Sequence, residues 1–187
     1  MATTPPEGIH PPLWSRETRF DGRLIRVVVD TCESDEGETI HRELVLHPGA
    51  AAILPVLPDG RLLLVSQYRR PPDAALWEIP AGKLESGEEP LACAKRELVE
   101  ETGHEAGEWR ELLTFYTTPG FSDERITLFL ARQLVQSALP DAHEIDQCRA
   151  FELDELVRMI HSAELRDGKT ILAIEHYRTS FEGPRKD

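Results

Sequence analysis

The chain of 187 residues is long enough for one well-buried domain and too short for two ordinary ones. Its 34 acidic residues outnumber its 21 basic ones, and the formal charge of −13 disfavours binding to nucleic acid or to an anionic membrane surface. Three cysteines without a C-x-x-C pair argue against a disulfide framework, and no segment approaches the ~20 apolar residues of a membrane span, so we expect a cytoplasmic protein.

The amino-acid composition changes along the N-terminal part of the chain. Residues 1–13 are rich in proline and offer little to bury, so we expect a flexible N-terminus there. The β-branched run at 24–30 and the alternating segment at 40–46 then predict about three strands. We interpret residues 14–48 as an antiparallel β appendage and residues 49–187 as the main domain.

Two apolar runs follow in the main domain. Residues 51–57 and 62–68 flank a turn-forming Pro-Asp-Gly at 58–60, which predicts a hairpin buried on both faces. A further short strand is expected at 76–79. These segments would form the centre of a sheet.

A helix predicted at 89–102 carries the residues best suited to metal binding or catalysis. At 100° per residue, Glu97, Glu100 and Glu101 fall on one edge of its apolar face. There they would be partly desolvated and would repel one another, a conflict that a divalent cation resolves. Carboxylate oxygens in this number suit Mg²⁺, or alternatively Mn²⁺. A solvated glutamate-rich helix, with ion pairs such as Arg96 to Glu100, is the alternative that these residues alone leave open.

The rest of the chain alternates between strand and helix patterns. Residues 111–117 and 126–133 are typical of strands, and 154–163 and 170–181 are typical of amphipathic helices. The fold class predicted from the residues is therefore α/β, with a mixed sheet and helices on its faces.

A spaced pattern surrounds the glutamate-rich helix. Gly82 is followed after five residues by Glu88, and after seven more by Arg-Glu-Leu-Val-Glu-Glu-Thr-Gly at 96–103. The segment resembles the Nudix box, G-x5-E-x7-R-E-U-x-E-E-x-G-U with U apolar. It departs only at the last position, where His104 replaces an apolar residue. The resemblance implies an α/β/α sandwich and hydrolysis of a nucleoside diphosphate linked to another group.

The resemblance also implies roles for individual residues. Glu97, Glu100 and Glu101 are implied as metal ligands, together with the backbone carbonyl of Ala81. Arg96 is implied to orient a ligand carboxylate through a salt bridge. Glu97, Glu101 and Arg96 are therefore expected to serve catalysis. We expect the two box glycines to allow tight backbone paths on either side of the helix.

Residues beyond the box are similar to the ADP-ribose pyrophosphatase subgroup of this family. That subgroup is marked by a proline about sixteen residues past the box, and Pro119, followed by Gly120, stands sixteen after Gly103. The resemblance implies a homodimer with an exchanged N-terminal appendage, and a nucleoside diphosphate sugar as the substrate. A plain type II turn is the alternative for Pro119 and Gly120.

Four further side chains are candidates for substrate binding. Arg69 is expected to contact the diphosphate, because a guanidinium offers bidentate hydrogen bonds, and Glu78 to accept one from the adenine or a ribose hydroxyl. Phe20 and Arg26, with Trp14 beside them, could stack on the adenine. Core packing is the alternative for these last three, and plain solvent exposure is the alternative for Arg69 and Glu78.

The family resemblance implies a catalytic glutamate on a loop after the last long strand. Here that loop is 137–147, and Glu144 is our choice of base, with Asp141 and Asp146 as rivals. Two other functions stay open: a pyrophosphatase of GDP-mannose or another nucleotide sugar, and a non-catalytic ADP-ribose-binding protein. The latter usually lacks box glutamates, all of which are present in this sequence.

Overall fold

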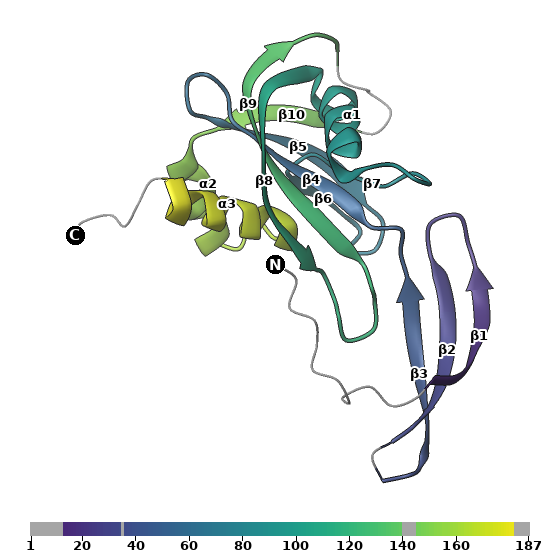
Figure 1. The fold of residues 1–187 in the computed structure, drawn as a ribbon. Helices are drawn as coiled ribbons and strands as arrows, with labels where there is room; N and C mark the ends of the chain where they lie inside the picture. Colours follow the sequence, from purple (N-terminus) through teal and green to yellow (C-terminus); the bar gives the residue numbers. More distant parts are fainter. Residues whose placement is uncertain (1–12, 35, 140–144, 182–187) are drawn as a thin grey trace. The chain divides into compact units, whose positions relative to one another are not determined.

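The computed structural model describes residues 13–34, 36–139 and 145–181 (Figure 1). The chain forms two compact units. The first contains Met1–Gly49 and Tyr116–Arg125, and the second contains Ala50–Phe115 and Ile126–Asp187. The segment expected to be flexible, 1–13, lies outside the described residues except for Leu13. None of the helices in the described ranges is both long and apolar enough to cross a membrane.

The first unit contains a three-stranded antiparallel sheet in the order β1-β2-β3. Its strands are β1 (Leu13–Asp21), β2 (Arg26–Glu33) and β3 (Thr39–Leu46). In the middle strand, Val28, Asp30 and Cys32 are buried and alternate with less buried residues, as the two-residue period of a strand requires. The edge strand β1 is exposed along its whole length. The prediction of about three N-terminal strands is confirmed.

A later segment of the chain completes this unit. The N–H of Val45 donates to the carbonyl of Phe121 at 2.8 Å, and the carboxylate of Asp123 accepts from the N–H of His47 at 2.8 Å. The turn before it is closed by the N–H of Phe121, which donates to the carbonyl of Thr118 at 3.2 Å. Gly120 does not have the positive φ that a type II turn needs at this position, so that alternative is wrong.

The second unit contains two sheets, with strand orders β10-β5-β6 and β7-β4-β9-β8. The strands are β4 (Ala50–Pro55), β5 (Leu62–Arg69), β6 (Ala74–Glu78), β7 (Ala81–Lys83), β8 (His104–Tyr116), β9 (Arg125–Gln136) and β10 (Gln147–Phe151). Strand β4 runs parallel to β9 and antiparallel to β7, so the sheet is mixed, as predicted.

The predicted hairpin of the two apolar runs is only partly formed. Its turn is present, since Gly60 has a φ of 91° and the N–H of Leu57 donates to the carbonyl of Arg61 at 2.9 Å. The strands then diverge after a single bridge between Val56 and Leu62, and β4 and β5 enter different sheets. Apolar runs predict burial but do not specify a partner, and each strand here has two other neighbours.

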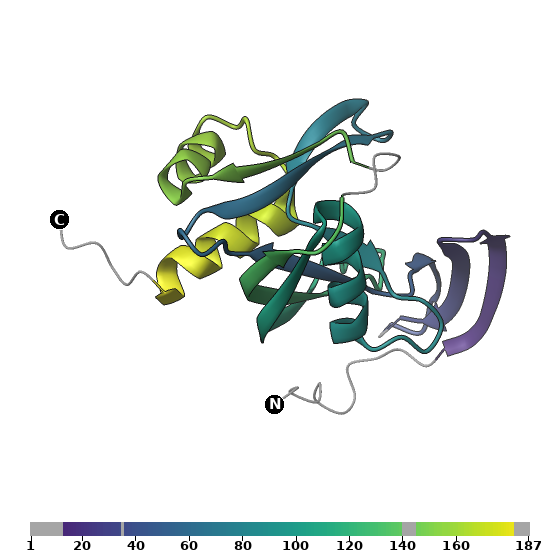
Figure 2. The ribbon, with the colours of Figure 1, turned by 90° about the horizontal axis from the view of Figure 1, so that it is seen from above.

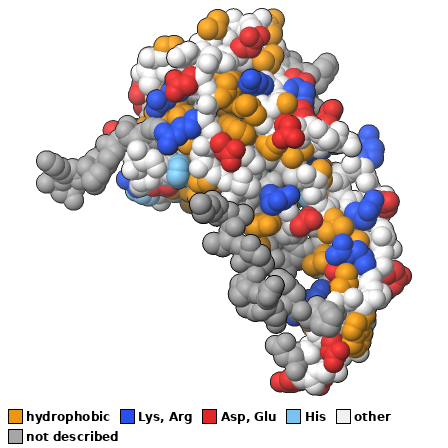
Figure 3. All heavy atoms as spheres, in the orientation of Figure 1, with side chains coloured by type: hydrophobic (Ala, Val, Ile, Leu, Met, Phe, Trp, Pro, Cys, Tyr) orange, Lys and Arg blue, Asp and Glu red, His pale blue; other side chains and the backbone are white. Residues whose placement is uncertain are grey.

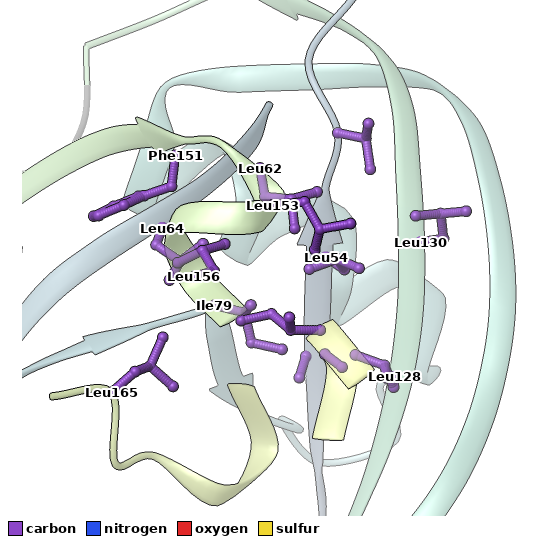
Figure 4. Close-up of a cluster of buried hydrophobic side chains, with 14 of the residues drawn as sticks. Leu54, Leu62, Leu64, Ile79, Leu128, Leu130, Phe151, Leu153, Leu156 and Leu165 are labelled. Carbon is purple, nitrogen blue, oxygen red and sulfur yellow. The ribbon is translucent and has the colours of Figure 1, made fainter. Parts of the chain in front are cut away.

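Among the described residues of the second unit, three helices cover the strands: α1 (Pro90–Thr102), α2 (Leu153–His161) and α3 (Gly168–Phe181). The two ribbon views show α1 on one side of β4 and α2 and α3 on the other (Figures 1 and 2). Ala51 and Ile53 of β4 pack in the cluster that contains the buried residues of α1, whereas Ala52 and Leu54 pack in the larger cluster with α2 and α3 (Figure 4). Burial on both faces of β4 makes this an α/β/α sandwich.

Candidate active site

Helix α1 has well-defined ends. Pro90 occupies its first turn, where a missing N–H is tolerated, and Gly103 ends it with a φ of 71°. The carbonyl of Gly103 accepts hydrogen bonds from the N–H groups of Ser137 and Ala138 at 2.9 and 3.0 Å. A Cβ at Gly103 would overlap the carbonyl oxygen of Ala138. This glycine therefore both ends the helix and fixes the chain that leads into the following loop.

Two of the three glutamates predicted as metal ligands lie within the buried face of α1. Glu97 is 8% exposed and Glu101 is 4% exposed, whereas the side chain of Glu100 is 51% exposed. Positions 97 and 101 stand one turn apart beside the buried Ala94 and Leu98. One nitrogen of Arg96 donates to both Glu97 and Glu100, so Glu100 shares this edge of the helix but lies on its more exposed side.

The absence of a side chain at Gly82 leaves room for the carboxylate of Glu97. Gly82 lies on β7, where it pairs with Ala51 of β4, and a Cβ at this position would overlap the carboxylate of Glu97. Its φ lies outside the left-handed region, so the backbone conformation does not require glycine. The expected role in a tight backbone path is therefore replaced by one in close side-chain approach.

Arg96 is the centre of a group that we call the box cluster, consisting of Glu88, Arg96, Glu97, Glu100 and Glu101. Its Nη1 donates to Glu97 at 2.6 Å and to Glu100 at 2.9 Å, and its Nε and Nη2 donate to Glu88 at 3.1 Å each. These hydrogen bonds raise the pKa of Arg96 and hold that of Glu88 below its ordinary value. The implied salt bridge to a ligand carboxylate is present, while its role in catalysis stays a prediction.

Glu101 is a buried carboxylate with a negatively charged neighbour. Burial, reinforced by the negative charge of Glu97, raises the pKa of Glu101 to about 8, although the charges of Arg69 and Lys169 oppose this shift. Its Oε2 accepts a hydrogen bond from the backbone N–H of Ala81 at 3.1 Å. Ala81, the residue expected to supply a carbonyl ligand, therefore contacts this carboxylate through its N–H.

The box cluster has the donor chemistry of a site for a hard divalent cation. Three carboxylates share one arginine and Glu101 lies on the same helix, so the four carboxylates and one guanidinium leave a formal charge of 1 − 4 = −3, and two of the four are buried. Within the described ranges no three acidic, histidine or cysteine side chains already converge on one point at metal-binding distance. In this arrangement Arg96 holds Glu97 and Glu100, while a backbone N–H holds Glu101.

Two cations outside the box cluster, Arg69 and Lys169, lie near enough to Glu101 to lower its pKa. Nε and Nη2 of Arg69 donate to the two oxygens of Glu78 at 2.8 Å each. The pairing of β5 with β6 places Val65 opposite Glu78, so Arg69, four residues farther along β5, projects from the same face of the sheet. The Nζ of Lys169, in the first turn of α3, donates to Glu78 as well.

Lys169 is held from the other side by the cap of α3. The Oδ2 of Asp167 accepts from Lys169 Nζ at 3.0 Å and from the N–H of Thr170 at 3.0 Å. The hydroxyl of Thr170 in turn accepts from the N–H of Ile79 at 2.9 Å. We call Arg69, Glu78, Asp167 and Lys169 the Glu78 cluster.

Sequence reasoning did not find Lys169 or Asp167. The only available signal was an aspartate three residues before a threonine at a helix start, which indicates a cap. Nothing in the order of residues shows that this cap meets Glu78, which lies 91 residues before Lys169.

The carboxylate of Glu78 is fully engaged. Burial favours a raised pKa for this group, but the hydrogen bonds and charges of Arg69 and Lys169 outweigh burial and place the pKa of Glu78 below its ordinary value. Glu78 is 2% exposed, which rules out the alternative of plain solvent exposure. Its predicted contact with adenine or ribose stays a prediction.

The remaining substrate candidates lie in the first unit, namely Phe20, Arg26, Pro119 and Gly120. Phe20 is 56% exposed and Trp14 is 52% exposed, so the alternative of core packing within this chain is wrong for both aromatic residues. Arg26 pairs with Asp21, its Nε donating at 2.9 Å, and its side chain is also about half exposed.

The chosen base, Glu144, and its rival Asp141 lie outside the described residues. The chain that follows them is attached to the second unit, since the N–H of Asp146 donates to the carbonyl of Ser66 on β5 at 2.9 Å. The chain that precedes them is attached to Gly103 at the end of α1. The described residues on the two sides of this segment therefore contact the end of α1 and strand β5.

The fold has a counterpart among solved structures. A crystal structure of an ADP compounds hydrolase matches with a TM-score of 0.81 over 92% of this chain and 95% of that chain, at 21% identity. Such a likeness establishes the class of fold, an α/β/α sandwich of the Nudix type.

Sequence comparison extends this likeness. The model of the NUDIX domain matches residues 45–174, and the chain belongs to the NUDIX family of hydrolases, as predicted. An ADP-ribose pyrophosphatase of Bacillus subtilis (strain 168) is 41% identical over 167 residues, covering 87% of this chain and 89% of that protein. A methanol dehydrogenase activator of Bacillus methanolicus is 40% identical over 163 residues, covering 86% and 88%. Members of this family generally require a divalent metal ion, which agrees with the charge of the box cluster.

Proposed function

We propose that the protein hydrolyses the diphosphate bond of ADP-ribose, or of a related nucleoside diphosphate sugar, to AMP and a sugar phosphate with Mg²⁺ as cofactor. The observation that carries this proposal is the burial of Glu97 and Glu101 on one face of α1, over a glycine that leaves room for a carboxylate. The relative in Bacillus subtilis named ADP-ribose pyrophosphatase supports the choice of substrate.

Metal binding is assigned to the box cluster. Glu97, Glu100, Glu101 and the carbonyl of Ala81 would hold Mg²⁺, with Mn²⁺ as the alternative ion. When bound, the ion supplies charge neutralisation at the phosphates and lowers the pKa of a coordinated water. Arg96 keeps the carboxylates of Glu97 and Glu100 together by donating to both from one nitrogen.

Substrate binding is assigned to four side chains. Arg69 binds the diphosphate, and Glu78 positions the guanidinium of Arg69 by accepting from its Nε and Nη2. Phe20 and Arg26 stack on the adenine, since each side chain is more than half exposed.

Two further assignments complete the proposed site. The turn at Pro119 and Gly120 contacts the nucleotide. Glu144 accepts the proton of the attacking water, with Asp141 and Asp146 as rivals for that step.

Substitution of the most buried box glutamate tests the function. Glu101→Gln should keep its fold, lose at least about 100-fold in the rate of AMP release from ADP-ribose, and lose Mg²⁺ binding in calorimetry, because a ligand charge is removed. The exposed Glu108→Gln serves as the matched control and should behave as the wild type. Turnover of Glu101→Gln near the wild-type rate would refute the metal role.

The substrate alternatives separate in a panel of nucleotide sugars. Faster release of a sugar phosphate from GDP-mannose than from ADP-ribose would favour the GDP-mannose pyrophosphatase. Calorimetric binding of ADP-ribose without hydrolysis in Mg²⁺ would favour a non-catalytic binding protein. All four glutamates of the box are present in this chain, which supports the enzyme over the binding protein.

A cytoplasmic homodimer, formed through the appendage at 14–48, is part of the proposal. The edge strand β1 is exposed throughout, and the apolar side chains of Leu13, Trp14, Phe20 and Leu24 are each more than half exposed. Hydrophobic side chains are visible on this unit in the space-filling view (Figure 3). An uncovered edge with apolar side chains favours pairing with a second copy. Light scattering should give twice the chain mass for the wild type, and a monomer for it would contradict this part.

A further inference from the structure

We propose that Lys169 is a positioning residue that neutralises Glu78 when Arg69 turns away from it to bind the diphosphate. The inference rests on the proposed function, because it concerns the binding of that substrate. It adds a residue of α3 to a site otherwise built from the box helix and the sheets.

The two cations on Glu78 differ in their freedom to move. The side chain of Arg69 is 39% exposed, whereas that of Lys169 is 12% exposed. Lys169 is also tied to Asp167 at 3.0 Å, and Asp167 is fixed in turn by the backbone and hydroxyl of Thr170, which is fully buried. Arg69 is therefore the cation that can leave, and Lys169 is the one that stays.

The departure of Arg69 would be costly without Lys169. Glu78 is 2% exposed, and a buried carboxylate that loses its only cation is strongly destabilised. With both cations present the Glu78 cluster sums to 2 − 2 = 0, and without Arg69 it sums to 1 − 2 = −1 while Glu78 keeps a direct ion pair. The guanidinium can then exchange one bidentate partner for another, from a carboxylate to a phosphate.

Steady-state kinetics of ADP-ribose hydrolysis at saturating Mg²⁺ tests the inference. Lys169→Met should raise KM by about tenfold or more while kcat stays within about threefold. Without Lys169, the ion pair between Glu78 and Arg69 competes with the diphosphate for Arg69 and weakens substrate binding in the ground state. Lys169→Arg should recover KM to within about threefold of the wild type. Lys169→Gln keeps a hydrogen-bond donor near Glu78 without the charge and should show the same increase in KM. It replaces Lys169→Met in the test if that variant folds poorly. The exposed Lys95→Met on α1 is the control and should keep both constants.

A double variant separates positioning from direct contact with the substrate. In Lys169→Met combined with Glu78→Gln, position 78 carries no charge when Arg69 leaves, so KM should return to within about threefold of that of Glu78→Gln alone. A double variant whose KM stays as high as that of Lys169→Met would overturn the inference. An unchanged KM in both Lys169→Met and Lys169→Gln would do the same.

The failure of the inference is distinguishable from that of the proposed function. Active wild type with an unaltered KM in the lysine variants contradicts the inference alone. Wild type that binds ADP-ribose without hydrolysis contradicts the enzyme, and the same comparison of variants is then made on the Kd measured by calorimetry. Wild type that neither binds nor hydrolyses ADP-ribose contradicts both.

Discussion

The box cluster and the Glu78 cluster both consist of acidic and basic side chains within one unit, yet their formal charges differ, at −3 and 0. In the first, one arginine, Arg96, pairs with three of the four carboxylates, and burial raises the pKa of the fourth, Glu101, to about 8. In the second, two cations and two carboxylates match, and the pKa of Glu78 is lowered. An excess of negative charge suits the binding of a metal ion. A balanced cluster allows one of its cations, Arg69, to leave while the other still neutralises Glu78.

The largest expected effect comes from filling the space beneath Glu97. Gly82→Ala should reduce AMP release at least about 100-fold, because the added Cβ overlaps the Glu97 carboxylate and displaces it from the box cluster. Gly168→Ala, where a Cβ would meet nothing within 4 Å, is the control and should keep its activity. Wild-type turnover in Gly82→Ala would mean that the position of Glu97 does not matter, which would remove the contrast between the clusters.

A second expected effect is the pH dependence of the metal-free box cluster. The pKa of Glu101 in the folded protein, about 8, lies above its ordinary value of 4.5, so the folded state binds the extra proton between these values. In EDTA, the free energy of unfolding should therefore fall as pH rises from about 5 to about 8, by a few kcal/mol in order of magnitude. Urea denaturation at several pH values measures it. Glu101→Gln should flatten the dependence of the free energy of unfolding on pH. An equally steep dependence in that variant would mean that another group causes it.

The Glu78 cluster should respond in the other direction and by less. Because the folded pKa of Glu78 is lowered, its contribution is present above the unfolded value and is lost as pH falls through the folded one. We expect the wild type to lose about 2 kcal/mol more than Glu78→Gln between pH 5 and pH 3, a modest figure since Arg69 is partly exposed to solvent. The same urea series supplies the data, and parallel curves for the two proteins would contradict the pairing.

Several features could be read from residue order because they depend on local geometry. The spacing of Glu97 and Glu101 by four residues places them on one helix face, and Pro90 and Gly103 bound that helix whatever surrounds it. The charge excess of the box and the metal chemistry that follows from it are likewise properties of a short segment. The sequence by itself therefore determined the box helix and its acidic face.

Other features were decided only by tertiary structure, because they join segments that are far apart in the chain. Apolar patterning predicted that β4 and β5 are buried, but not that they belong to different sheets. The need for glycine at position 82 comes from Glu97 on a helix packed against it. The ion pair of Lys169 with Glu78 spans 91 residues and exists because α3 begins beside β6, a packing relation that no local pattern encodes.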